Sequence, residues 1–184
     1  MTSTATPKIN GKYIILCALA VFLTWILHEF SHWSAGELLG LDMTMSLNRT
    51  FQLHAETSSV SNAVIISIAG PLFTLCQAVI VFFIIKKTKN WFLYPFLLVC
   101  FYMRFFAALV SFRKLNDEAW VSKLLGIGAY TLPIIFSGIL FLLVYNTSHT
   151  NRYSRRFNLS TLGFIILFSS LLIVADSVFK IRIL

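Results

Sequence analysis

The sequence predicts an all-α polytopic membrane protein with about five transmembrane helices and a small β-hairpin between the first two. The 184 residues are 58% hydrophobic and only 12% charged, and mean hydropathy is +0.81. A soluble domain of this length carries about twice that charge. Apolar runs long enough to cross a bilayer recur between clusters of Lys and Arg. Between the first two runs, apolar and polar residues alternate, as in a strand.

The net charge of +8 does not indicate a nucleic-acid partner. The basic residues cluster between apolar runs, where they flank the membrane and contact anionic headgroups, so the expected partner is the lipid bilayer. The cysteines, Cys17, Cys76 and Cys100, each fall inside a predicted span. Their spacing fits neither a disulfide framework nor a Cys-x-x-Cys site, which leaves them as small apolar side chains.

Residues 1–12 form a polar N-terminal tail, and the first span covers residues 13–33. The helix is expected to continue towards Gly36 or Gly40, since either glycine can end it. The basic start followed by apolar residues imitates a signal peptide. The apolar run continues directly into a segment rich in His and Glu, however, which favours an uncleaved span.

Residues 42–56 change to a period of two, with 48–50 as the turn, which predicts a β-hairpin at the membrane surface. A free edge of this hairpin could receive an extended substrate strand. A surface loop that only packs against the protein is an equally good interpretation. His54 falls on the polar face and is not expected to bind a metal.

The second span, residues 60–85, is expected to break at Ala69-Gly70-Pro71-Leu72, because Pro71 cannot donate to its helix. Gly70 allows another backbone to approach closely. In the third span, residues 91–112, Arg104 needs a carboxylate or carbonyl partner unless it snorkels.

A short helix is expected at 117–125, capped by Asn116. The fourth span covers 124–145, with Pro133 as a kink, and the fifth covers 159–179, where Asp176 can snorkel beside Lys180. The chain therefore divides into the tail at 1–12, a core at 13–125 and two further transmembrane helices at 126–184.

The end of the first span contains His28-Glu29-Phe30-Ser31-His32. Residues four apart share a helix face, so both imidazoles can reach one metal ion. This spacing is the H-E-x-x-H zinc signature, in which the glutamate is the general base. The alternative, two core histidines and a snorkelling glutamate, is disfavoured because ionisable groups near the end of an apolar helix are costly. Thr24 lies on the same polar stripe.

A catalytic zinc site needs a third protein ligand. Glu37 lies on the opposite face of the helix from His28. The third span ends on the same side of the membrane as the histidines, so Asp117, or else Glu118, is the expected ligand, provided that a bend brings it back. Alternatively, both carboxylates only offset the local helix dipole.

Together, His28-Glu29-Phe30-Ser31-His32, Ala69-Gly70-Pro71-Leu72, Asp117 and the hairpin between the first two resemble the site-2 protease family of intramembrane zinc metalloproteases. The likeness covers roughly residues 13–125. In that family the third ligand sits in Leu-Asp-Gly with prolines upstream and an asparagine several residues earlier. Here the corresponding sequence is Leu115-Asn116-Asp117-Glu118, without that glycine or those prolines. The chain thus resembles a divergent, minimal core.

The resemblance implies Zn²⁺ held by His28, His32 and Asp117, with Glu29 as general base and Asn116 stabilising the oxyanion. It implies cleavage of peptide bonds in or near transmembrane segments of another membrane protein or peptide. The alternative function is non-hydrolytic metal binding, as in a transporter, a sensor or a degenerate homologue.

We expect a multi-pass protein of the cell membrane. Basic residues in the loops mildly favour a cytoplasmic N-terminal side. The resemblance favours the opposite orientation, with the active site nearer the cytoplasm, and this is the orientation we expect.

Overall fold

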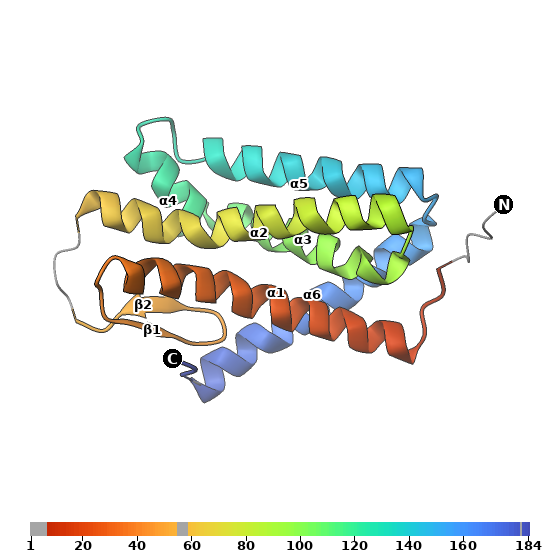
Figure 1. Cartoon of the computed structure of the whole chain (residues 1–184), viewed down its shortest axis with the longest axis horizontal. Coiled ribbons are helices and arrows are strands. Elements are labelled where there is room, and N and C mark those ends of the chain that lie inside the picture. Colours follow the sequence, from red (N-terminus) through yellow and green to blue (C-terminus); the bar gives the residue numbers. More distant parts are fainter. Residues whose placement is uncertain (1–6, 55–58, 181) are drawn as a thin grey trace.

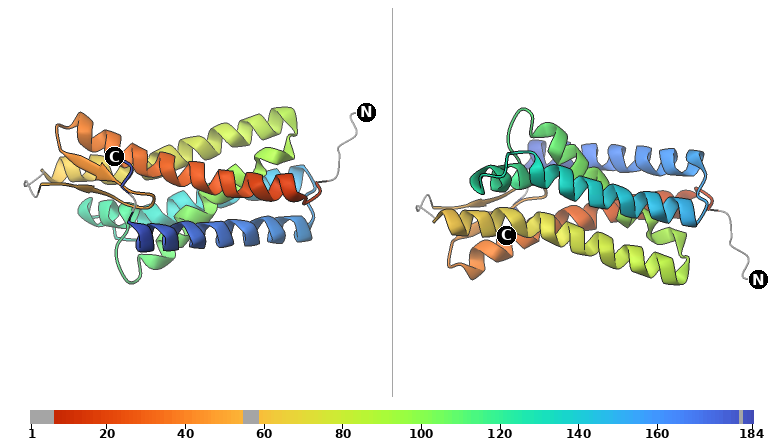
Figure 2. Two further views of the ribbon diagram at one scale, coloured as in Figure 1. Left: turned by 90° about the horizontal axis from the view of Figure 1, so that it is seen from below. Right: turned by 90° about the horizontal axis from the view of Figure 1, so that it is seen from above.

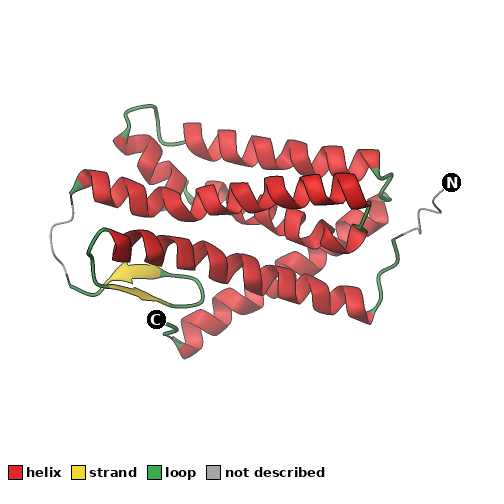
Figure 3. Cartoon of the chain, in the orientation of Figure 1, coloured by secondary structure: helices red, strands yellow, loops and turns green. Residues whose placement is uncertain are grey.

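A computed structural model of the chain describes residues 7–54, 59–180 and 182–184, and it confirms the predicted fold class (Figures 1 and 3). In chain order the elements are α1 (Gly11–Leu38), β1 (Met43–Met45), β2 (Thr50–Gln52), α2 (Val60–Thr88), the 3₁₀ turn η1 (Trp91–Leu93), α3 (Tyr94–Val110), α4 (Asp117–Leu124), α5 (Thr131–Thr150) and α6 (Arg155–Phe179).

Within the described ranges, five helical segments are long and apolar enough to cross a membrane: α1, α2, η1 with α3, α5 and α6. Large apolar side chains point outward along all of them; examples are Phe22, Phe83, Phe105, Leu142 and Val174. An aqueous protein does not expose so much continuous apolar surface. The molecule is therefore a multi-pass membrane protein whose solvent, over most of its length, is lipid.

The two ends of the bundle differ in what they carry (Figures 1 and 2). One end holds the start of α1, the α2–η1 turn and the α5–α6 link. The other end holds the hairpin, α4 and the C-terminus. This is the arrangement that the predicted parity of the spans requires, with the third span ending on the same side as His28 and His32.

The long first helix lies at the centre of the packing and contacts α2, α3 and α6. Its fully buried residues follow helical spacing: Tyr13, Cys17, Ala20, Val21 and Thr24. The helix ends at Leu38, and Gly40 follows with φ of +77°, a conformation that only glycine adopts without strain. Of the two predicted stops, Gly40 is therefore the one used.

The predicted hairpin is confirmed over its described residues; the last two predicted positions, 55 and 56, lie outside them. β1 and β2 pair antiparallel with Met43 opposite Gln52 and Met45 opposite Thr50. The indole Nε1 of Trp25 donates to Asn48 Oδ1 at 2.6 Å, so the turn of the hairpin lies beside the middle of α1.

The second helix is not broken at Pro71 as the sequence predicted, because α2 runs without interruption from Val60 to Thr88. Proline removes one helical hydrogen bond, but tertiary contacts on both sides hold the helix together.

The fourth span is also shifted along the sequence from its predicted start at residue 124. The chain between α4 and α5 contains Gly126 and Gly128 at positive φ, and α5 begins only at Thr131. Pro133 then sits in the first turn, where its missing N–H has no helical partner to lose, so it makes no kink.

Asp176 was expected to snorkel, and this was wrong: it is buried, and its Oδ1 accepts a hydrogen bond from the backbone N–H of Leu47 at 3.1 Å. Residues 182–184 pair with the outer edge of β1. Met45 N donates to Leu184 O at 2.9 Å, and Ile183 N donates to Met45 O at 2.8 Å. The end of the chain thus occupies one edge of the hairpin.

Candidate metal centre

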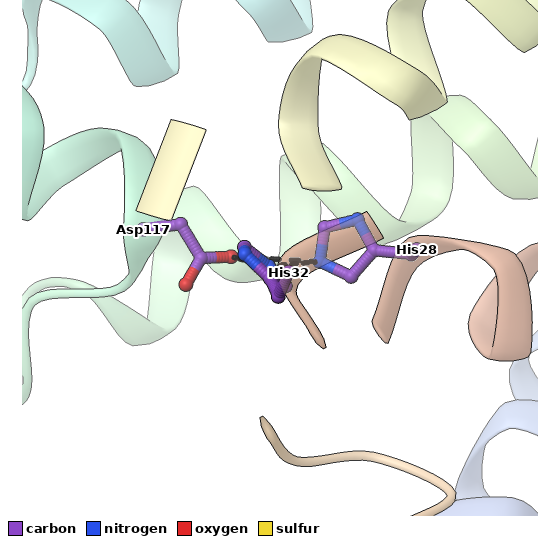
Figure 4. Close-up of side chains that lie close together, drawn as sticks. All are labelled: His28, His32 and Asp117. Carbon is purple, nitrogen blue, oxygen red and sulfur yellow. Dashed lines mark hydrogen bonds and ion pairs between the residues drawn. The ribbon is translucent and has the colours of Figure 1, made fainter. Parts of the chain in front are cut away.

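His28 and His32 of α1 and Asp117 of α4 come together at the end of the bundle that carries the hairpin (Figure 4). The two Nε2 atoms are 3.2 Å apart, and each lies 3.5 Å from Asp117 Oδ2. Both imidazoles are buried, whereas the Asp117 side chain is 34% exposed. Three potential ligand atoms from two helices therefore converge on one point, as the sequence predicted.

The bend that the prediction required lies between α3 and α4. α3 ends at Val110, and Ser111 Oγ then accepts a hydrogen bond from Asn116 N at 3.2 Å. The amide Nδ2 of Asn116 donates to Ala107 O at 3.1 Å, which ties the turn back onto α3. α4 starts at Asp117 and packs against α2 and α5. This reversal brings Asp117 back to the depth of the histidines.

Each histidine is oriented by a hydrogen bond at its outer nitrogen. The Thr74 hydroxyl donates to Gly70 O at 3.0 Å, so it can only accept from His28 Nδ1, which lies 3.0 Å away. His32 Nδ1 lies 2.6 Å from the carbonyl oxygen of Ile66, which can also only accept. Both neutral rings therefore carry their proton on Nδ1. Their Nε2 lone pairs point at each other and at a carboxylate oxygen.

Close approach of α2 to the two rings depends on Gly70. A Cβ atom at this position would overlap His32 Nε2 and would lie 2.8 Å from His28 Nδ1. Real side chains do not pack so tightly. Gly70 therefore permits a close approach, but the groups that approach it are the side chains of the two histidines and not, as the sequence had predicted, another backbone.

Glu29 is 7% exposed and is held by the hairpin. The hydroxyl of Thr50, on β2, lies 3.0 Å from Glu29 Oε2 and 3.1 Å from the backbone oxygen of Glu29. A single hydroxyl therefore fixes the carboxylate relative to its own main chain. The general base expected from the sequence is a buried carboxylate beside the histidines, oriented by a strand.

Arg104 of α3 is buried, and its guanidinium reaches the same cluster. Its Nη1 lies 3.1 Å from Glu118 Oε1 and 3.5 Å from Asp117 Oδ2, and its Nη2 lies 3.3 Å from His28 Nε2. The carboxylate partner that the sequence required for this arginine is therefore confirmed. Glu118, the reserve ligand, is turned to Arg104 and does not join the group formed by His28, His32 and Asp117.

The donor set fits a divalent cation. Two imidazole lone pairs and a carboxylate oxygen face one another without a proton between them, an arrangement that repels unless a positive charge lies at its centre. Three acidic side chains, Glu29, Asp117 and Glu118, meet one basic side chain, Arg104, so acidic groups outnumber basic ones at the cluster. Nitrogen and carboxylate ligands in this number are those of catalytic zinc.

Other polar residues considered from the sequence lie outside the centre. Thr24 Oγ1 accepts from Gln77 Nε2 at 2.8 Å, Glu37 Oε1 accepts from Met43 N at 2.9 Å, and the exposed His54 lies 3.1 Å from Asp42. Glu37 and His54 are therefore not part of the group formed by His28, His32 and Asp117. The amide nitrogen of Asn116 is engaged by Ala107 O, and its role towards an oxyanion stays a prediction.

Sequence reasoning missed the groups that orient the site: Thr50, Thr74 and the carbonyl of Ile66. Thr74 had a usable signal, because it lies one helical turn after Gly70, on the face where the glycine permits close approach. The carbonyl of Ile66 and the strand residue Thr50 had none.

No protein-family model, curated protein sequence or solved structure matches this chain. The assignment of the centre therefore depends on its geometry and chemistry alone.

Proposed function

We propose that the protein is an intramembrane zinc metalloprotease, which hydrolyses peptide bonds in or near transmembrane segments of other membrane proteins. One observation carries the proposal: His28, His32 and Asp117 present metal-binding atoms to one point within an apolar bundle, directly beside the buried carboxylate of Glu29. The sequence resemblance to site-2 proteases supports the same reaction.

A zinc ion held by the three ligands would lower the pKa of a water molecule and polarise the scissile carbonyl. Glu29 accepts the proton of that water and passes it to the departing amine. Thr50 keeps the Glu29 carboxylate in one orientation during this transfer. The two histidines need no proton exchange, because their Nδ1–H groups remain bonded to Thr74 and Ile66.

The hairpin offers a place for the substrate. Hydrogen bonds from Ser46 N to Arg49 O and from Leu53 N to Asp42 O fix the pairing, so Thr50 and Gln52 turn their backbone groups away from β1. Among described residues these groups have no backbone partner, whereas the opposite edge is occupied by Leu184. A substrate segment, once unwound, adds as a strand to β2, beside Glu29.

A competing function has one specific observation in its favour. The Nη2 of Arg104 lies within hydrogen-bond distance of His28 Nε2, so the arginine already supplies a positive charge to the ligands. In a degenerate, non-hydrolytic homologue the guanidinium would permanently take the place of the cation. Such a protein would need no general base.

Replacement of Glu29 by Gln separates the two functions. For the protease, E29Q should retain about one zinc per molecule while cleavage of a transmembrane peptide falls at least 100-fold, because general-base catalysis contributes about 10²–10⁴. Zinc is measured by mass spectrometry of the protein purified in detergent, and cleavage is measured by the appearance of the shorter product on a denaturing gel. A His28→Ala variant, which removes a ligand, is the control that loses both.

Undiminished cleavage by E29Q would contradict the protease assignment. Wild-type protein that purifies folded, does not cleave and takes up no zinc would favour a non-hydrolytic protein in which Arg104 replaces the cation, and one that holds zinc without cleaving would favour non-hydrolytic metal binding. We also propose that the protein lies in the cell membrane and that the end of the bundle with the metal centre faces the cytoplasm.

A further inference from the structure

Arg104 is more closely tied to the metal centre than charge balance requires. A buried arginine in an apolar helix needs one carboxylate, and Glu118 supplies it at 3.1 Å. The guanidinium nevertheless extends to His28 Nε2 and Asp117 Oδ2, two of the three atoms of the metal cluster. A second function of this side chain would explain that extension.

The lone pair of His28 Nε2 can be used only once. Its ring proton is on Nδ1, bonded to Thr74, so Nε2 has a single lone pair. In this structure Arg104 Nη2 lies 3.3 Å from His28 Nε2, so its N–H occupies that lone pair. A metal ion bound to His28 would use the same lone pair, and the N–H of Arg104 would be released at the centre. The buried Nε of Arg104 also has no partner among the described residues.

A guanidinium released in this way cannot itself bind the metal, because it has no lone pair to offer. It is permanently charged and rigid, which suits it to an oxygen that gains negative charge. During hydrolysis the water oxygen bonds to the scissile carbon, and the carbonyl π pair moves onto oxygen. When this pair returns, the C–N bond breaks and the amine leaves with the proton carried by Glu29. A fixed donor directed at that oxygen lowers the barrier.

We propose that Arg104 is the oxyanion-stabilising group of this centre, a role that presupposes the protease function. The resemblance to site-2 proteases implies Asn116 for this role, but its amide nitrogen is already bonded to Ala107 O. Arg104 instead contacts the ligand atoms themselves. Glu118 then serves as the counter-ion that holds the guanidinium at the cluster.

The test uses the double variant R104M/E118Q in the full chain. It removes both members of the pair, so that no buried charge is left without a partner. Two single variants are compared with it: E118Q, which retains the guanidinium, and R104K, which retains the charge with fewer donors. Five quantities are measured: kcat and KM for a transmembrane peptide, zinc content, zinc affinity by chelator competition, and affinity for a phosphinic peptide that mimics the tetrahedral oxyanion.

We expect R104M/E118Q to keep one zinc ion with undiminished affinity, since a competitor for His28 Nε2 has been removed. Its kcat should fall about 10²- to 10³-fold with KM unchanged, as for loss of an oxyanion donor. The phosphinic peptide should bind correspondingly more weakly. R104K and E118Q should each retain part of the activity, because the first keeps the charge and the second keeps the guanidinium without its counter-ion.

Two results would overturn the assignment while leaving the protease function intact. The first is a double variant with wild-type kcat. The second is a parallel loss of zinc and activity, which would mean that Arg104 only holds Asp117 in place. Failure of the wild-type protein to hold zinc or to cleave would instead refute the proposed function, and this inference with it.

Discussion

At the scale of single residues, the centre is defined by groups that form hydrogen bonds with the Nδ1 atoms of the two histidines. The Thr74 hydroxyl and the Ile66 carbonyl leave each Nε2 atom unprotonated and directed inward. Such outer partners typically change metal affinity 10- to 100-fold when removed. Gly70 matters as much, because it lets these partners approach. A residue with no side chain is thus among the most constrained in the protein.

Gly70→Ala should weaken the centre although it improves helix propensity by about 1 kcal/mol. The added Cβ overlaps the His28 and His32 rings, and overpacking of this kind costs about 1–3 kcal/mol. If the rings move to relieve it, zinc affinity should fall about 10- to 100-fold. Chelator competition measures this. Gly138→Ala in α5 is the matched control, because its Cβ would meet nothing within 4 Å. Equal zinc affinity in the two variants would contradict this account of Gly70.

At the scale of elements, the hairpin is held beside α1 by groups from three parts of the chain. Glu37 accepts from Met43 N, Asp176 accepts from Leu47 N, and Leu184 pairs with Met45. A two-stranded hairpin is marginally stable alone. Its fixed position, and through Thr50 the position of Glu29, therefore depends on α6 and the C-terminal residues, which the resemblance to site-2 proteases does not include.

Asp176→Ala should loosen the hairpin without affecting metal binding. A hydrogen bond to a charged group contributes about 1.5–3 kcal/mol, so exchange of the Leu47 amide should accelerate about 10- to 100-fold. Hydrogen exchange read by mass spectrometry over residues 43–52 measures this. Ser177→Ala is the control, because its exposed hydroxyl bonds only to Ile173 O in its own helix. Unchanged exchange in Asp176→Ala would show that the other two anchors suffice.

At the scale of the whole molecule, one end of the bundle carries the hairpin, α4 and the candidate metal centre, and the other end consists of turns between helices. The exposed apolar surface of the five spans fixes the molecule across a bilayer. The centre then lies nearer one face, where Asp117 is partly exposed and the other ligands are buried. Water can reach the candidate metal site from that face, and in the proposed function an unwound substrate segment would reach it along β2.

Single cysteines should report this topology. Lys87→Cys and Arg155→Cys lie at the end opposite the centre, and Arg113→Cys and Lys123→Cys lie at the end of the centre; all four positions are exposed. An impermeant maleimide added to intact cells should label the first pair only, if the centre faces the cytoplasm. The native cysteines, Cys17, Cys76 and Cys100, lie within the apolar spans, out of reach of an impermeant reagent. Labelling of the second pair only would reverse the orientation, and labelling of one member of each pair would contradict the fold.

The sequence by itself determined the membrane class, the hairpin, and the roles of His28, His32 and Asp117 as ligand candidates. These features depend on local patterns: long apolar runs, alternation with a period of two, and a spacing of four on a helix. The parity of the spans added the side on which Asp117 emerges. Local patterns also misled in places, since Pro71 does not break α2 and Pro133 does not kink α5.

Only the tertiary structure decided which carboxylate of the pair at 117 and 118 meets the histidines, and what Arg104 contacts. It alone placed Thr50 against Glu29, Asp176 against the hairpin, and the end of the chain along β1. These contacts join residues from 21 to 140 positions apart. They follow from the way in which whole helices pack, and no pattern within a single segment encodes that packing.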